Sequence, residues 1–139
     1  MIPSRVPRVM LPLLLLVLAR AAGAAGQAGD AGGTDAPPPL PPGNPATGAH
    51  LYGACMGCHS LDDNDVGPRH RGVVGRAAGA VPGYAYSAAL KGSGIVWTPD
   101  NLDRWLSGPQ KMVPGAKMYF SIAKPQDRAD IIAYLAQQK

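Results

Sequence analysis

The sequence predicts a mainly α-helical domain with few helices and long connecting loops. Helix-start signals such as Asn44-Pro45 recur along the chain. The stretch from 60 to 83 is rich in glycine and proline without a sustained apolar period, and no β-hairpin pattern is visible. Loops of this length in a compact domain need something to fold around, which indicates a large bound group.

Length and composition limit the possibilities further. The chain has 139 residues and a mass of 14.3 kDa, which leaves room for one domain. Its two cysteines exclude a scaffold built on several disulfides. The formal net charge of +4 is dispersed, with no basic run or aromatic ladder, so we expect no binding to nucleic acid.

Residues 1–25 are predicted to be a signal peptide that is removed on export. Arg5 and Arg8 precede the apolar run 11–19, and small residues follow it. The run is shorter than the ~20 residues that span a bilayer, so we expect no transmembrane span in the mature form. The expected location is the periplasm, and the alternative is a membrane anchor formed by an uncleaved N-terminus.

A flexible linker is predicted over residues 26–43, because this glycine- and proline-rich segment lacks apolar periodicity. The folded domain is expected over residues 44–139. Its first helix should begin at Asn44-Pro45 and run to about Cys58, with Gly48 and Gly53 marking close packing against another backbone.

Three further helices are expected. Ser87 should cap a short helix over 88–91 that ends at Gly92. Another should begin at Thr98-Pro99, with the apolar stripe Leu102, Trp105 and Leu106, and Gly108-Pro109 should stop it. The last should open at Pro125, with Asp127 and Asp130 near its N-terminus and the apolar face Ile131, Ile132, Tyr134 and Leu135.

The chemistry points to Cys55-Met56-Gly57-Cys58-His59, which has the C-x-x-C-H spacing of c-type haem attachment. Two cysteines three residues apart can form thioethers to both vinyl groups of one porphyrin, and His59 can then offer an imidazole nitrogen to the iron. A thioredoxin-like site lacks its βαβ setting, and a zinc site lacks a second ligand pair. A disulfide this local would constrain little of the unfolded chain.

The sixth ligand of a haem iron can be a methionine or a histidine. Met118 follows a proline-glycine turn that could hold its sulfur in place, so it is favoured, whereas Met112 is expected to fill the core. His50 and His70 are rival ligands by residue type. Both are expected to be surface or polar contacts, with His70 on the side of His59.

From about Asn44 onward the chain resembles a bacterial class I cytochrome c, similar to mitochondrial cytochrome c. The resemblance implies a small single-haem fold, with few helices and long loops around one covalent haem c per chain. The matching stretches are CMGCH (55–59), GPRHRGVVGR (67–76), PGYAYSAALK (82–91), GIVW (94–97), VPGAKMYF (113–120) and RADIIAYL (128–135).

The resemblance also implies roles for individual residues. Cys55 and Cys58 would carry the haem, and His59 and Met118 would be the axial ligands. The Pro68 carbonyl would bind the proximal N–H. Four residues would surround the haem propionates: Arg76, Tyr84, Tyr86 and Trp97.

Some positions depart from the family pattern. The family has a glycine and an aromatic residue eight and four positions before the first haem cysteine. In this chain those positions hold Thr47 and Leu51, and Gly48 and Tyr52 each lie one residue later. Three further departures lie near the predicted haem pocket and put the reduction potential in doubt: Leu90, Trp105 and Ala116.

The predicted function is that of a soluble periplasmic electron carrier of a respiratory chain, not an enzyme. His/Met ligation would favour ferrous iron and raise the potential. Expected partners are redox proteins such as a cytochrome reductase complex, a terminal oxidase or a periplasmic dehydrogenase. The protein is expected to be a monomer and to bind these partners transiently. The alternative is a haem-based small-ligand sensor or a peroxidase-like protein with a labile sixth ligand.

Overall fold

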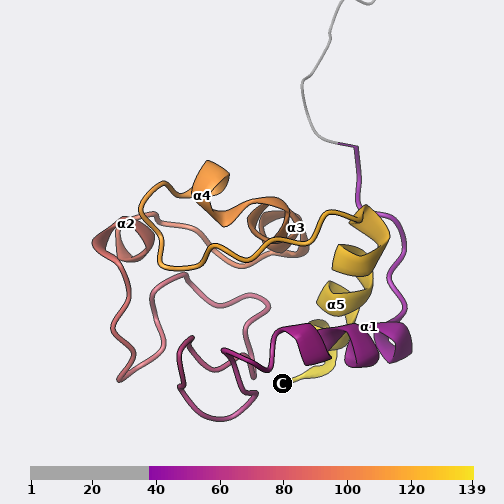
Figure 1. Cartoon of the computed structure of the whole chain (residues 1–139), viewed down its shortest axis with the longest axis horizontal. Coiled ribbons are helices and arrows are strands. Elements are labelled where there is room, and N and C mark those ends of the chain that lie inside the picture. The colour runs from indigo at the N-terminus through magenta and orange to yellow at the C-terminus, as the bar shows by residue number, and fades with distance from the viewer. Residues whose placement is uncertain (1–37) are drawn as a thin grey trace, which may run out of the picture. The chain divides into compact units, whose positions relative to one another are not determined.

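The computed structural model describes residues 38–139 (Figure 1). The predicted signal peptide and most of the predicted linker lie outside the described residues. Within them, Ala77 and Val96 form an isolated antiparallel bridge, and no strand is present. The helices are α1 Pro45–Leu51, the 3-10 helix η1 Tyr52–Ala54, α2 Ala88–Lys91, α3 Pro99–Ser107, α4 Pro109–Met112 and α5 Pro125–Gln137. The mainly α-helical class is confirmed.

The first helix begins as predicted and ends earlier. The Asn44 side chain accepts hydrogen bonds from the N–H groups of Ala46 and Thr47, at 2.9 and 3.2 Å. The predicted helix to Cys58 is too long, because the α-helix stops at Leu51 and tighter turns continue the chain. The Cys55 N–H, for example, donates to the Tyr52 carbonyl at 2.8 Å. This tightening turns the two cysteines out of the α-helical register.

Helices α1 and α5 cross at a glycine (Figure 1). A Cβ on the buried Gly48 would collide with the Asp130 carbonyl, so only glycine permits this approach. Tyr52 packs on Tyr134 with ring centroids 5.2 Å apart. The glycine and the aromatic residue that pack against α5 are therefore Gly48 and Tyr52, one position later than in the family pattern. The Asp130 carboxylate also accepts from the Asn44 N–H at 2.7 Å, which joins the start of α1 to the middle of α5.

The middle helices follow their predicted caps, with one addition. The Ser87 and Thr98 hydroxyls each accept from a backbone N–H in the first turn of α2 and α3. The chain was expected to stop being helical at Gly108-Pro109. Instead, the extended backbone at Gly108 redirects the chain, and Pro109 takes the first position of the short helix α4. Proline is tolerated there because that position needs no N–H donor.

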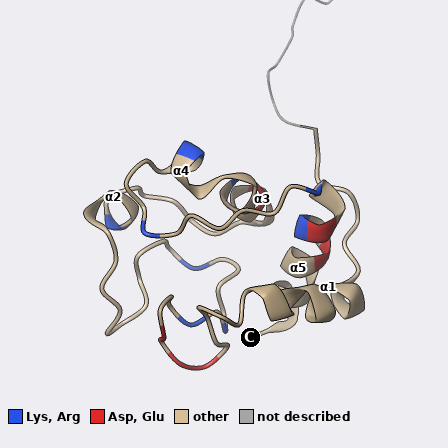
Figure 2. Cartoon of the chain, in the orientation of Figure 1, with Lys and Arg blue, Asp and Glu red and all other residues tan. Residues whose placement is uncertain are grey.

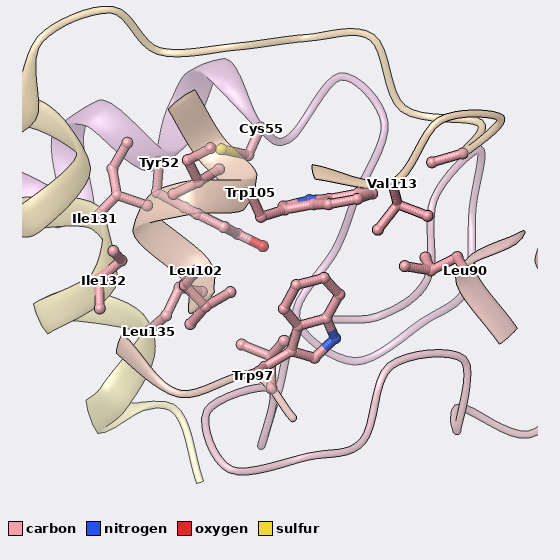
Figure 3. Packing of buried hydrophobic residues seen from close by; sticks show 13 residues of the cluster. Tyr52, Cys55, Leu90, Trp97, Leu102, Trp105, Val113, Ile131, Ile132 and Leu135 are labelled. Carbon is pink, nitrogen blue, oxygen red and sulfur yellow. The ribbon is translucent and has the colours of Figure 1, made fainter. Parts of the chain in front are cut away.

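Within the described residues, one cluster of buried side chains joins η1, α2, α3 and α5 to the loops (Figure 3). The rings of Trp97 and Trp105 lie 5.2 Å apart at its centre. The predicted stripe of α3 is buried, as are Ile131, Ile132 and Leu135 of α5, while Tyr134 is half-buried. Burial of this apolar surface is the main force holding the helices together.

The end of the predicted linker already contacts the domain. Leu40 packs against the hydrophobic cluster, and the Gln126 side chain donates to the Pro42 carbonyl at 2.9 Å. Leu40 and Pro42, which precede the boundary expected at Asn44, thus already contact the domain. None of the helices within residues 38–139 combines the length and apolar character needed to cross a membrane.

Candidate functional site

The two cysteines lie in the turns that follow η1. The Cys55 thiol is buried and Cys58 is exposed, and both are free. The Cys58 and His59 N–H groups donate to the Cys55 carbonyl, which fixes the turn between them. Burial, together with the neighbouring Cys58, raises the pKa of the Cys55 thiol to about 11. Both thiols and the imidazole of His59 line one cavity.

His59 is oriented by a backbone carbonyl. Its Nδ1 lies 2.7 Å from the Pro68 oxygen. Because a carbonyl can only accept, Nδ1 carries the proton and Nε2 keeps a free lone pair. Burial lowers the pKa of His59, although the hydrogen bond to Pro68 opposes this shift. The side chain is therefore a neutral imidazole, which is the form that binds metals.

Gly67 makes this arrangement possible. A Cβ at this position would collide with the Cε1, Nδ1 and Nε2 atoms of the His59 ring. Its backbone N–H donates to the Cys58 carbonyl at 2.6 Å, which ties the loop to the attachment turn. Sequence reasoning did not single out Gly67, although the Gly67-Pro68 dipeptide is a signal for a special backbone position.

His70 lies beside His59, on the side that the sequence predicted. The two rings stack with centroids 4.0 Å apart and planes 22° apart. The Tyr52 hydroxyl lies 3.1 Å from Nδ1 of His70. Burial lowers the pKa of His70 to about 3, so its ring is neutral and accepts from the Tyr52 hydroxyl. His50 is exposed on α1 and is not among the cavity residues.

Met118 occupies the loop between α4 and α5. The indole Nε1–H of Trp105 donates to its sulfur at 3.2 Å. The amide of Gln110 donates to the carbonyls of Ala116 and Met118, at 2.7 and 2.8 Å. Met112 is half-buried and packs against the hydrophobic cluster, as a core-filling side chain does. No sequence signal marked Gln110, because its role depends on a loop conformation that only the fold reveals.

The four residues expected near the propionates also line the cavity. Arg76 donates to the carbonyls of Arg71 and Arg69, at 2.9 and 2.7 Å. The Tyr84 hydroxyl donates to the Val66 carbonyl at 2.7 Å. The rings of Tyr84 and Tyr86 pack edge to face, with centroids 4.7 Å apart. Trp97 is buried against Trp105.

The cavity itself has a volume of about 540 Å³ and is bordered mainly by apolar side chains. This volume and character fit a large, flat, apolar ligand. Its polar groups include two thiols, the imidazoles of His59 and His70 and a thioether, together with Ser87, Lys117 and the arginine and tyrosine groups described above. Leu90 and Trp105, two of the departures from the family pattern, lie on its wall, whereas Ala116 is buried and is not among the lining residues. The residues present fit a haem held by two thioether bonds.

Comparisons with known proteins agree with this chemistry. The family model described as Cytochrome c matches residues 45–139. The chain is 53% identical over 102 residues to cytochrome c2 of Rhodopila globiformis, covering 70% of this chain and 96% of that protein. It is 44% identical over 100 residues to cytochrome c2 of Rhodomicrobium vannielii, covering 69% of this chain and 80% of the relative.

A solved structure gives the same picture. Cytochrome cH from Methylobacterium extorquens superposes with a TM-score of 0.66 at 46% identity, covering 68% of this chain and 98% of that one. The fold is the small single-haem fold of class I cytochromes, and the cofactor is haem c, bound covalently through Cys55 and Cys58. With the attachment turn, the cavity and the relatives in agreement, the chain belongs to the cytochrome c family, as a small haem-binding electron carrier.

Proposed function

We propose that this protein is a soluble periplasmic one-electron carrier, without enzymatic activity, in which His59 and Met118 are the axial ligands. The observation that carries the proposal is that both side chains lie on the wall of the cavity that also holds the two cysteines. Each is held by a hydrogen bond of its own, His59 by Pro68 and Met118 by Trp105.

The bound haem supplies iron that alternates between the ferric and ferrous states. The protein's part is to hold both ligands still and to keep the iron closed to other molecules. The Pro68 carbonyl accepts the Nδ1–H of His59, which keeps Nε2 free of a proton and makes it a stronger ligand. The Trp105 N–H polarises the Met118 sulfur, which disfavours the ferric state and supports a raised potential.

The propionate roles of Arg76, Tyr84, Tyr86 and Trp97 are part of this proposal. All four border the cavity, and each carries an N–H or O–H donor, although the Tyr84 O–H is donated to the Val66 carbonyl here. Arg76 uses two N–H groups on backbone carbonyls, which leaves three of its five for a carboxylate. Such charge-assisted hydrogen bonds would offset the cost of burying propionate groups.

Two observations support a closed site over the sensor or peroxidase alternative. Trp105 and Gln110 hold the Met118 segment by side-chain hydrogen bonds, which disfavours a labile sixth ligand. A peroxidase also needs an acid-base residue on the distal side. The histidine that shares the cavity with His59 stacks on that ring, which places it with the proximal ligand.

Partners are proposed to be redox proteins that dock transiently on a monomer: a cytochrome reductase complex, a terminal oxidase or a periplasmic dehydrogenase. Figure 2 shows few charged residues on the described chain, with lysines on α2 and α4 and aspartates in the loop 61–65. Loss of the predicted signal peptide would leave ten lysines and arginines against nine aspartates, a net charge of +1. Steering of partners by charge should accordingly be weak.

Optical spectroscopy of the exported protein tests the axial ligands. Ferric protein should show the weak near-infrared sulfur-to-iron band of methionine-ligated haem. The band should vanish in Met118→Ala and persist in Met112→Ala, a matched control from the same part of the chain. A high-spin ferric spectrum without the band, and prompt binding of cyanide, would favour the open-site alternative.

Export and domain boundaries need a separate test. We propose a signal peptide over 1–25, a linker over 26–43 and the haem domain over 44–139. Cell fractionation and N-terminal sequencing of the haem-loaded protein should find it in the periplasm and beginning near residue 26. Recovery of the intact chain in the membrane fraction would instead support an N-terminal anchor.

A further inference from the structure

One side chain, Gln110, makes three hydrogen bonds to the loop that carries Met118. Its Nε2 donates to the Ala116 carbonyl at 2.7 Å and to the Met118 carbonyl at 2.8 Å. Its Oε1 accepts from the Gly115 N–H at 3.3 Å. The two donors and the acceptor of the amide are therefore all directed at residues 115–118.

Few main-chain hydrogen bonds hold the loop, and one other side chain, Lys117, ties it to the Ala85 carbonyl. Within residues 114–121 the main chain forms one hydrogen bond to another main-chain group from its own N–H groups, from Ala116 to the Val113 carbonyl at 3.1 Å. Gly115 has a φ of 85°, in the left-handed region that favours glycine, so the turn depends on a special backbone position. A segment with so few internal bonds opens locally at low free-energy cost unless side chains restrain it.

The helix that carries Gln110 is well anchored. It is the second residue of α4, directly after Pro109, whose side chain is fully buried. The Val113 N–H donates to the Pro109 carbonyl at 2.8 Å and closes the short helix. The amide thus connects an anchored helix to a weakly bonded loop, and it is half-buried where it does so.

We propose that Gln110 is a positioning residue that keeps the Met118 loop closed and so sets how often the sixth position of the iron opens. The inference rests on the proposed ligation by Met118. It assigns the stability of that ligation to the amide, in addition to the Trp105 hydrogen bond to the sulfur. Trp105 contacts the ligand atom itself, whereas Gln110 acts on the backbone that carries it.

The rate at which cyanide or imidazole binds to ferric protein measures loop opening, because either ligand needs the sixth position. In Gln110→Ala this rate should rise by about tenfold or more, since the loop loses three hydrogen bonds at once. In Gln110→Glu it should rise at least as much. That variant keeps the side chain's length but turns a carboxylate oxygen toward two carbonyl oxygens.

Gln137→Ala is the matched control, because Gln137 is an exposed residue of α5 far along the chain. Its binding rate should equal that of the unchanged protein. All variants should also be unfolded with denaturant. A clamp predicts faster ligand binding, a free energy of unfolding that falls by no more than the amount the faster binding corresponds to, and earlier loss of the near-infrared band on warming.

Three results would overturn the inference. If Gln110→Glu binds ligands as slowly as the unchanged protein, the side chain only fills space. If the unfolding midpoint falls in Gln110→Ala and ligand binding does not accelerate, the side chain contributes only to general stability. If the unchanged protein lacks the near-infrared band altogether, the proposed ligation fails first and the clamp has no ligand to hold.

Discussion

Trp105 donates its indole N–H to the sulfur of Met118 across 3.2 Å, linking α3 to the loop after α4. An indole nitrogen donates and cannot accept, so the direction of this bond is certain. With Met118 as the proposed axial ligand, its sulfur in Trp105→Phe should donate more strongly to ferric iron, and the reduction potential should fall. Loss of one hydrogen bond of ~1 kcal/mol corresponds to about 40 mV for a one-electron couple.

Spectroelectrochemical titration measures this change. Leu106→Val is a suitable control, because it removes packing volume from the same helix and the same cavity without touching a hydrogen bond. An unchanged potential in Trp105→Phe, or an equal fall in the control, would show that the hydrogen bond does not tune the iron.

Gly67→Ala should disrupt the position of the His59 ring in the cavity. The added Cβ would occupy the position of the His59 ring, so either the ring or the loop has to move. We expect a severalfold lower yield of low-spin haem protein, since strain of this kind costs about 1–3 kcal/mol. Gly57→Ala lies in the same attachment segment with open space around its added Cβ, and it should behave normally. Equal yields from both variants would contradict the contact.

Gly48→Ala should destabilise the whole domain rather than the ligand. The new methyl group would meet the Asp130 carbonyl and the Tyr134 Cβ, which forces α1 and α5 apart. The expected loss in the free energy of unfolding is about 2–4 kcal/mol, measured by denaturant titration. In Gly53→Ala, where the added Cβ meets nothing within 4 Å, the loss should be small. A stable Gly48→Ala variant would mean that the helices can separate freely.

The buried ion pair between α3 and α5 gives a fourth test. Arg128 contacts Asp103 and donates to the carbonyls of Ile122 and Ala123, both at 2.9 Å. Arg128→Met should cost about 3–5 kcal/mol of unfolding free energy, because it leaves a carboxylate and two carbonyls without their donor. In the exposed pair, Arg71→Met should change stability little. Similar losses of unfolding free energy in the two variants would show that burial does not determine the contribution of these ion pairs.

Local signals predicted much of this molecule. Cap residues and prolines located the starts of α1, α2, α3 and α5, because a helix terminus satisfies its first N–H groups with nearby side chains. The spacing of Cys55, Cys58 and His59 identified the attachment segment, since porphyrin geometry requires those residue types at that distance in the chain. The resemblance to a family then named the other residues that the fold brings to the cavity.

The tertiary structure decided the rest, for physical reasons that no local pattern encodes. The shift of the packing pair to Gly48 and Tyr52 was settled by the approach of α5, which lies some eighty residues away in sequence. The stack of His70 on His59 and the amide of Gln110 on the Met118 loop depend on where loops of irregular structure close. Short-range preferences set the elements and the chemistry by themselves. Long-range contacts between backbone segments determine how firmly each ligand is held, because only folding brings those segments together.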